Sequence, residues 1–216
     1  GSAINLNVTL GAAAMAAGLV TVTLNDDSAA DTVTIDSGYN SGTVTVNLDD
    51  DGAADTVTAA NSAATLIVAA DADELDSAIN VLTGGTGASD EIKITTVTGG
   101  NTIAAADTAS WSAFEKITTV GNSGVLSLEV SDANSVSTAM TIDATSMTST
   151  AFTFLGALED DSAFTITAAG SGAHVITLGS KNDSYTSTSS GIDTVTATAG
   201  VNTISTGAGA DVITGG

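Results

Sequence analysis

The sequence predicts an all-β protein, a parallel β-roll or β-helix solenoid, with one short helix around residues 71–83. Three observations lead to this prediction. Large β-compatible side chains recur in residues 174–216 at steps of nine or ten residues, which is typical of stacked repeats. Aromatic residues make up only 3% of the chain, so the core must be narrow and built from small side chains. Short alternations of apolar and polar residues recur elsewhere, as in half-buried strands.

The C-terminal repeat is the clearest element of the sequence. Its large side chains lie at five positions: Ile176, Tyr185, Val195, Ile204 and Ile213. An acid or amide lies two positions before four of them: Asp183, Asp193, Asn202 and Asp211. Glycine or a small polar residue fills most of the turns before these positions. Each unit of nine residues therefore holds one strand and one tight turn, and two units make a coil of 18 residues.

Residues 206–214, TGAGADVIT, match the pattern G-G-x-G-x-D-x-U-x in all but the first glycine. Gly207 and Gly209 permit positive φ angles and allow backbone carbonyls to converge, while Asp211 adds a charged oxygen. Asp193 and Asp211 are 18 residues apart, so a coil of that length stacks their carboxylates, which repel unless a cation lies between them. Calcium suits such a set of carboxylate and carbonyl oxygens.

The opposite edge of the same coils predicts a weaker calcium site. Asp183 and Asn202 are 19 residues apart there, and one of the two ligands is neutral. Asp and Gly also form turns without any metal, which is the alternative at both edges. Turn formation alone does not require a fixed period with an inward apolar residue in phase.

The N-terminal third begins with a strict alternation over residues 4–10 and then contains two related segments, residues 21–34 and 43–58. Both contain the tetrapeptide Asp-Thr-Val-Thr, which occurs again at residue 193. We interpret them as diverged relatives of the C-terminal units and expect calcium ligands there, with solvated turns as the alternative. The ligands expected are Asp27, Asp31, Asp51 and Asp55.

Residues 71–83 are the one good helix candidate, because Leu75, Ile79 and Leu82 lie at i, i+4 and i+7. Acidic residues at its start suit the positive end of the helix dipole. The Asp71-x-Asp73 pair could hold a metal–nucleotide complex, but capping of the helix explains it more simply.

A further nonapeptide with one extra residue lies at 83–94 and places Asp90 in the ligand position. We expect three regions: 1–82 with the diverged repeats, 83–170 as a solenoid segment, and 171–216 as the nonapeptide roll. The last residues, Gly215 and Gly216, begin another unit, so we expect the array to continue beyond this chain.

Charge limits the possible partners. Lys and Arg total 3 against 25 Asp and Glu, a formal net charge of -22, which argues against binding to nucleic acid or to anionic membrane surfaces and favours cations as partners. No uninterrupted apolar stretch is long enough to insert into a membrane. Cysteine is absent, so neither disulfides nor thiolate metal sites are expected.

The motifs together resemble bacterial surface-layer proteins and other repeats-in-toxin (RTX) proteins exported by type I secretion. The resemblance covers residues 83–216. It is carried by the nonapeptides around Asp90, Asp183, Asp193 and Asp211, by the F-E element in residues 112–117, and by the passage from residues 141–146 through 164–167 into the repeats. It implies a parallel β-roll, calcium-dependent folding outside the cell, and self-association into a lattice or fibre, or adhesion, at the cell surface.

We expect no enzyme activity in this chain. His174 is the one histidine, and its place nine residues before Asp183 indicates a diverged turn residue rather than a catalytic base. The first alternative function is the non-catalytic β-roll of a secreted RTX enzyme. The second is an ice-binding adhesin segment, because Thr-x-Thr pairs recur; their steps in sequence are uneven, however, and threonine also favours strands without any ligand.

Overall fold

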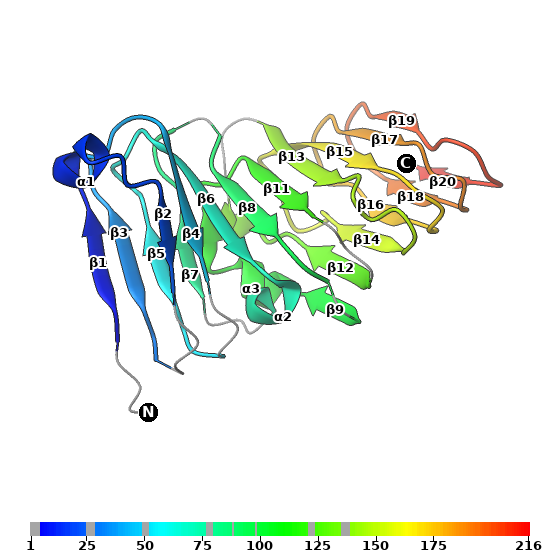
Figure 1. Ribbon diagram of the computed structural model, residues 1–216. Coiled ribbons are helices and arrows are strands. Elements are labelled where there is room, and N and C mark those ends of the chain that lie inside the picture. Colours follow the sequence, from blue (N-terminus) through cyan, green and yellow to red (C-terminus); the bar gives the residue numbers. More distant parts are fainter. Residues whose placement is uncertain are drawn as a thin grey trace.

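The computed structural model describes residues 5–24, 29–48, 52–76, 80–87, 89–97, 99–120, 124–134 and 139–216. The chain winds into an elongated stack of coils, with its N-terminus at one end and its C-terminus at the other (Figure 1). Every strand pairing among the described residues is parallel. The predicted all-β parallel solenoid is therefore confirmed.

Three parallel sheets form the walls of the stack. Sheet A contains β1 (Asn7–Leu10), β3 (Thr32–Ile35), β5 (Thr56–Thr58), β7 (Val81–Thr83) and β10 (Trp111–Ser112). Sheet B contains β2 (Thr21–Thr23), β4 (Thr43–Asn47), β6 (Thr65–Ala70), β8 (Glu91–Ile94), β11 (Lys116–Thr119), β13 (Ala139–Ala144), β15 (Ala163–Ala168), β17 (Ser184–Ser187) and β19 (Thr203–Ser205). Sheet C contains β9 (Gly100–Ile103), β12 (Val125–Glu129), β14 (Phe152–Leu155), β16 (Val175–Thr177), β18 (Thr194–Ala197) and β20 (Val212–Gly215).

Sheet B runs along the whole stack, opposite sheet A in the first coils and sheet C in the later ones. The coils shorten toward the C-terminus. The paired residues Thr32 and Thr56 are 24 apart, whereas Thr194 and Val212 are 18 apart. The 18-residue coil predicted for the repeats is thus present at the C-terminal end. The three regions 1–82, 83–170 and 171–216 remain a prediction, and sheet B passes through all of them.

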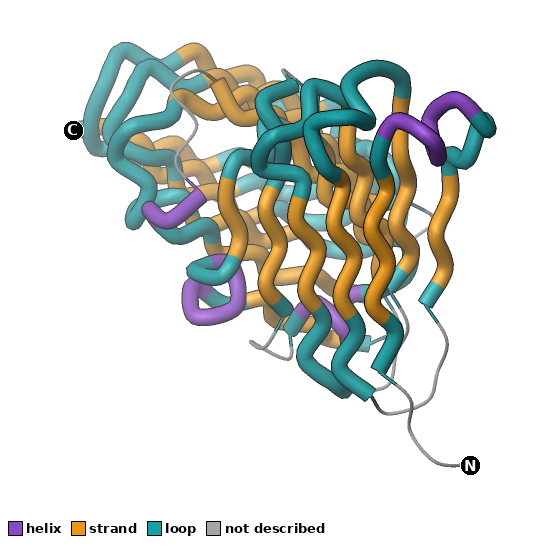
Figure 2. The backbone as a smooth tube through the Cα atoms, turned by 90° about the vertical axis from the view of Figure 1, so that its left-hand side faces the viewer, coloured by secondary structure: helices purple, strands orange, loops and turns teal. Residues whose placement is uncertain are grey.

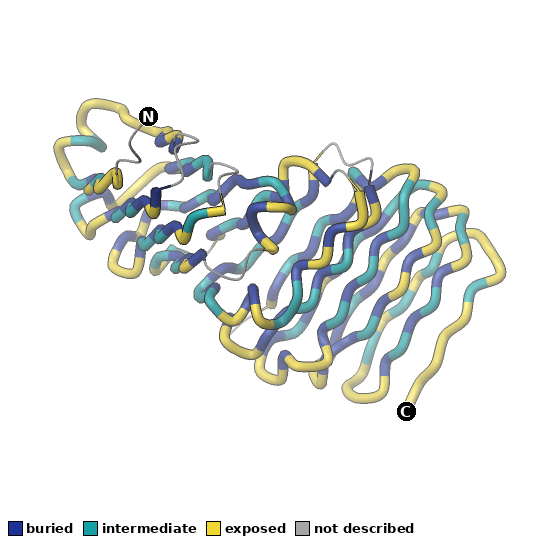
Figure 3. The backbone as a smooth tube through the Cα atoms, turned by 90° about the horizontal axis from the view of Figure 1, so that it is seen from below, coloured by how far each residue is buried: buried dark blue, intermediate teal, exposed yellow. Residues whose placement is uncertain are grey.

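The narrow core follows from the period of two along each strand, which points alternate side chains inward. Inward residues of successive coils lie level with one another, as with Ile176, Val195 and Ile213 in sheet C and with Tyr185 and Ile204 in sheet B. These are the five positions of the predicted repeat. Figure 3 shows buried residues alternating with more accessible ones along the strands, and exposed residues in the turns and the last coil, where β20 is exposed along its length.

The helices are short and lie at the coil corners (Figure 2). They are α1 (Ala12–Ala16), α2 (Ala72–Leu75), α3 (Ala105–Thr108) and the 3-10 turn η1 (Asp132–Asn134). The helix predicted over residues 71–83 is wrong in extent, because α2 ends at Leu75 and Val81–Thr83 forms β7. Leu82 belongs to that strand and is buried there, level with Val57. Ile79 lies outside the described residues. Asp71 caps α2 through its Oδ1, which accepts the N–H of Glu74 at 2.9 Å, as the capping interpretation predicted.

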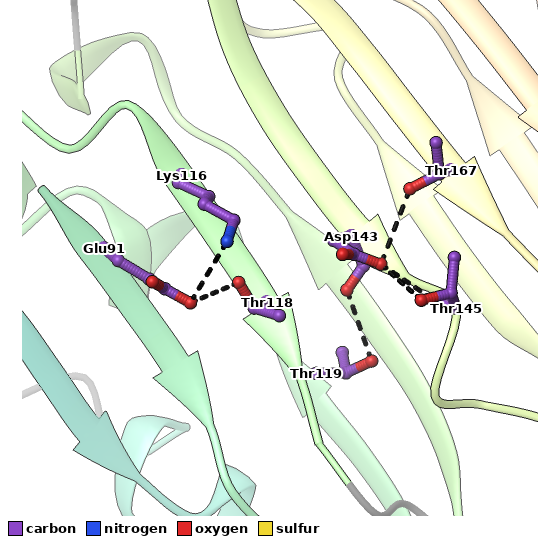
Figure 4. Close-up of polar contacts among 7 residues, drawn as sticks. All are labelled: Glu91, Lys116, Thr118, Thr119, Asp143, Thr145 and Thr167. Atoms are coloured by element: carbon purple, nitrogen blue, oxygen red, sulfur yellow. Dashed lines mark hydrogen bonds and ion pairs between the residues drawn. The ribbon is translucent and has the colours of Figure 1, made fainter. Parts of the chain in front are cut away.

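The outer face of sheet B carries polar side chains that bond across neighbouring coils (Figure 4). Lys116 Nζ lies 3.6 Å from Glu91 Oε1, and this is the one ion pair among the described residues. Asp143 Oδ1 accepts the hydroxyl of Thr167, in the next coil, at 3.5 Å. With 25 acids against 3 basic residues, most of the negative charge has no protein counterion. Within the described residues no helix is both long and apolar enough to cross a bilayer.

Candidate calcium-binding turns

The residue directly before a strand has a repeated role in this fold. Its side chain accepts a hydrogen bond from the backbone N–H of the residue that lies level with it one coil earlier, and we call each such series an acceptor ladder. The sheet A ladder contains Asp31, Asp55 and Asn80. Two ladders in sheet B contain Asp90 and Glu115, and Asp183 and Asn202. The sheet C ladder contains His174, Asp193 and Asp211.

The predicted stacking of Asp193 and Asp211 is confirmed, but their carboxylates do not face each other directly. Asp211 Oδ1 accepts the N–H of Asp193 at 2.9 Å. Asp193 is fully buried, and its two oxygens accept the N–H of His174 at 3.1 Å and the hydroxyl of Tyr185 at 2.9 Å. Repulsion between the stacked acids is therefore reduced by donors of the protein itself. Because both oxygens of Asp193 already accept hydrogen bonds, Asp211 is the carboxylate best placed to bind a cation at this edge.

The glycines of the last turn allow oxygens to approach the backbone more closely than a side chain would permit. Gly209 has φ +145°, and a Cβ placed on it would lie 2.9 Å from Asp211 Oδ1 and against the Gly191 carbonyl oxygen of the preceding coil. Gly207 has φ +83°, and a Cβ there would lie 2.6 Å from the Ser189 carbonyl oxygen. Carbonyl and carboxylate oxygens thus converge where a side chain would otherwise stand, which is the hard-oxygen environment that suits calcium.

Asp183 and Asn202 also lie one above the other, as predicted, on the opposite edge. Asn202 Oδ1 accepts the N–H of Asp183 at 2.7 Å, and Asp183 Oδ1 accepts the N–H of Phe164 at 2.8 Å. Asp183 is only 2% exposed, and its Oδ2 is buried without a hydrogen-bond partner. Burial raises the pKa of this carboxyl, because the charged form loses its hydration. A buried carboxylate oxygen of this kind fits a bound cation.

The N-terminal candidates Asp31 and Asp55 lie together in the sheet A ladder and are both buried. Asp31 Oδ1 accepts the N–H of Leu6 at 2.7 Å, and Asp55 Oδ1 accepts the N–H of Asp31 at 2.9 Å. These bonds hold the coils together without a metal, and calcium at these turns remains a prediction. Asp27 and Asp51 fall outside the described residues.

Asp90 is separated from the other predicted ligands and lies level with Glu115 of the F-E element. Its oxygens accept the N–H groups of Leu66 and Gly85, both at 2.6 Å, while its own N–H donates to Glu115 Oε2 at 2.8 Å. Burial raises the pKa of both carboxyls. The F-E element thus supplies the next member of a ladder, a role that the sequence did not show.

His174 occupies a ladder position, in agreement with its interpretation as a diverged turn residue. Its Nδ1 accepts the N–H of Phe152 at 3.2 Å, so the proton must reside on Nε2, which lies 3.2 Å from the Ala169 carbonyl oxygen. Both ring nitrogens are therefore engaged by the backbone, and the ring is fully buried.

Sequence reasoning missed one acidic cluster, which consists of Asp132, Glu159 and Asp161. It lies outside the nonapeptides, with Asp132 at the start of η1 and the other two in the turn between β14 and β15. The run of acids in residues 159–161 was visible in the sequence, but its pairing with Asp132 follows no period. The only available signal was the run itself.

Comparison with known proteins identifies the repeat. A family model described as the RTX calcium-binding nonapeptide repeat (4 copies) matches residues 187–216. The match covers the stacked turns with Asp193, Gly207, Gly209 and Asp211. Comparisons with curated proteins and with solved structures found no match. RTX repeats bind calcium and are typical of secreted extracellular proteins, and the parallel solenoid agrees with their β-roll. Residues 187–216 therefore carry RTX calcium-binding nonapeptide repeats.

Proposed function

We propose that this chain is a calcium-stabilised structural module of an extracellular bacterial surface protein, forming part of a surface-layer lattice or an adhesive stalk. The observation that carries the proposal is the convergence of Asp211 Oδ1 and the Gly191 carbonyl oxygen beside Gly209, within the matched repeats. The carboxylate of Asp183 supports it from the other edge, because one of its oxygens is buried without a hydrogen-bond partner.

Calcium acts here on folding rather than on chemistry. A formal charge of -22 and several buried carboxyls oppose compaction when no cation is bound. Calcium modules of extracellular proteins bind at about 10⁻⁴–10⁻³ M. At such affinities the ion stabilises the native state outside the cell and leaves the chain less stable at the low calcium concentration inside it.

The same negative charge makes self-association into a lattice or fibre depend on a bridging cation. Sheet B runs the length of the stack and gives it a continuous parallel backbone. Its turns expose carboxylates such as Asp36, Asp132 and Asp160, which repel a second copy unless a divalent ion bridges them. We therefore expect assembly to require calcium rather than screening by salt alone.

Calcium titration tests the proposal. Circular dichroism and calorimetry, with calcium and with excess chelator, are expected to show a large gain in melting temperature with the ion. Light scattering and electron microscopy are expected to show ordered assembly in calcium but not in 1 M NaCl with chelator. Unchanged melting in chelator would reject calcium-dependent folding, and assembly without calcium would reject the ion's role in association.

An ice-binding surface is the second candidate, favoured by one observation. The Thr-x-Thr pairs are unevenly spaced in sequence, yet the sheet A register places Thr9, Thr34, Thr58 and Thr83 level with one another. The turns absorb the differences in spacing, so uneven steps do not argue against a regular threonine row. Thermal hysteresis of the calcium-loaded protein measures this activity directly, and its absence eliminates this candidate.

A further inference from the structure

The turn between β14 and β15 lies above η1, which belongs to the preceding coil. One carboxylate oxygen from each of Asp132, Glu159 and Asp161 lies within 4.8 Å of the other two. The two segments also contact through the Asp160 N–H, which lies 3.5 Å from Asp132 Oδ1. Three carboxylates from two coils thus approach one another closely.

Glu159 is the residue that distinguishes this cluster from a solvated acidic turn. It is 0% exposed, whereas Asp132 and Asp161 are exposed. Its Oε1 is fixed by the N–H groups of Asp161 at 3.1 Å and Ser162 at 2.8 Å. Its Oε2 is buried and has no hydrogen-bond partner. A buried polar atom without a partner destabilises a fold, so this oxygen indicates a ligand at the cluster.

Local electrostatics points to a cation as that ligand. The one described ion pair, Lys116 with Glu91, lies on the outer face of sheet B and does not involve these residues. Three carboxylate oxygens lie within 4.8 Å of one another at the cluster, so their negative charges repel when no cation is present. A divalent ion at the centre offsets this repulsion.

We propose that Asp132, Glu159 and Asp161 form a calcium site outside the nonapeptide repeats, bridging two successive coils. The ligands are all hard carboxylate oxygens on turns, and the exposure of Asp132 and Asp161 leaves room for water to complete the coordination of calcium. The ion would join the coil of β12 to that of β14 and β15. These coils directly precede the repeats, so the site would provide a fixed base for the RTX roll.

The test uses the full chain and calcium alone as the probe. Glu159→Gln keeps the acceptor at Oε1 and removes the charge, while Asp160→Asn is the matched control, an exposed acid in the same turn that is not part of the cluster. By equilibrium dialysis the wild type and D160N are expected to bind the same number of calcium ions, and E159Q one fewer. In chelator E159Q is expected to melt at or above the wild-type temperature, since an unpaired buried charge is gone.

A second variant keeps the proposal testable if E159Q does not fold. Asp132→Asn alters an exposed side chain far away in sequence and is expected to weaken the same site at least tenfold, with an unchanged circular dichroism spectrum. Equal calcium stoichiometry and affinity in wild type, E159Q, D132N and D160N would overturn the site. The nonapeptide sites are intact in all four proteins, so this failure would leave the proposed function standing.

Discussion

Replacing Asp183 by asparagine separates the two tasks that this side chain performs. Its Oδ1 accepts the N–H of Phe164 at 2.8 Å, and its Oδ2 is buried without a hydrogen-bond partner. Asparagine keeps the acceptor of the ladder, as Asn202 does one coil later, and removes the charge. The substitution therefore leaves the ladder intact while it weakens any cation site.

The expected effect of D183N on stability has opposite signs in chelator and in calcium. An unpaired buried group costs about 1–3 kcal/mol when it is neutral and more when it is charged; asparagine keeps a polar group at this position but removes the charge, so in chelator D183N should be more stable than the wild type by about 1 kcal/mol or more. For a chain of this size 1 kcal/mol shifts Tm by about 2–4 °C, so the expected rise in Tm is about 2 °C or more. With Kd of about 10⁻⁴ M, about 5 mM calcium stabilises an intact site by about 2.3 kcal/mol. The variant should lose most of this gain.

Differential scanning calorimetry of both proteins in EDTA and in calcium measures the two effects. Asp160→Asn serves as the control, because it removes the same charge from an exposed position. The reasoning is refuted if D183N is less stable than the wild type in EDTA. It is refuted equally if both proteins gain the same stability from calcium.

Three further predictions concern the pH dependence and the sheet C ladder. Burial raises the folded-state pKa of six carboxyls. Each of them contributes its whole stabilising effect below its ordinary pKa, and the folded state loses that effect as pH rises through the raised pKa. The six are Asp76, Asp90, Asp107, Glu115, Glu159 and Asp183. Chelated protein should therefore melt at a higher temperature near pH 4.5 than at pH 7, and calcium should remove that advantage; the opposite order in chelator contradicts the assignment. His174→Ala should lower the free energy of unfolding by about 1–3 kcal/mol, because it leaves the buried Phe152 N–H unpaired. His174→Asn supplies another acceptor and should recover most of that free energy. Equal losses for the two variants in urea unfolding would show that the acceptor is unimportant. Tyr185→Phe removes the hydroxyl that donates to Asp193 Oδ2. In urea unfolding it should lower the free energy of unfolding by about 1–3 kcal/mol, both with and without calcium. A loss seen only with calcium would mean that the hydroxyl acts through a metal site.

Periodicity predicted the C-terminal coils well, because each coil there has nearly the minimum length. Two strands and two tight turns leave no room for insertions, so sequence separation translates directly into stacking. Asp193 and Asp211 follow this rule at 18 residues, and Asp183 and Asn202 at 19. In the earlier coils the turns contain additional residues, and the separation of level residues rises to 24 between Thr32 and Thr56 and to 29 between Leu82 and Trp111. Sequence spacing alone then no longer identifies the partner.

The failed part of the helix prediction has a physical cause of the same kind. Leu75 and Leu82 satisfy a helical spacing, but they are buried by different elements, α2 and β7. In a narrow solenoid every coil turns its apolar residues toward one axis, so short segments can imitate a helical period by accident. The cluster around Glu159 escaped prediction for a related reason, since its partner Asp132 is brought near by a coil with an irregular turn.

The ladder positions themselves show why acids at the calcium edges need a separate explanation. Asn80 and Asn202 accept the N–H of the coil before them at 2.9 and 2.7 Å, so a neutral amide performs the structural task. A carboxylate performs the same task and adds a charge that burial opposes at Asp183, where burial raises the pKa. The second oxygen is satisfied by the Tyr185 hydroxyl at Asp193 and by the Gly85 N–H at Asp90. At Asp183 the second oxygen has no hydrogen-bond partner, and there a cation would offset the cost. Aspartate at such a position thus makes the stability of the native state depend on calcium, whereas the neutral amide of Asn202 reduces that dependence at its own position. Substitution of Asn202 by aspartate should accordingly deepen the dependence on calcium, lowering Tm in chelator and raising it with the ion, and a uniform shift in both conditions would contradict this account of the ladder.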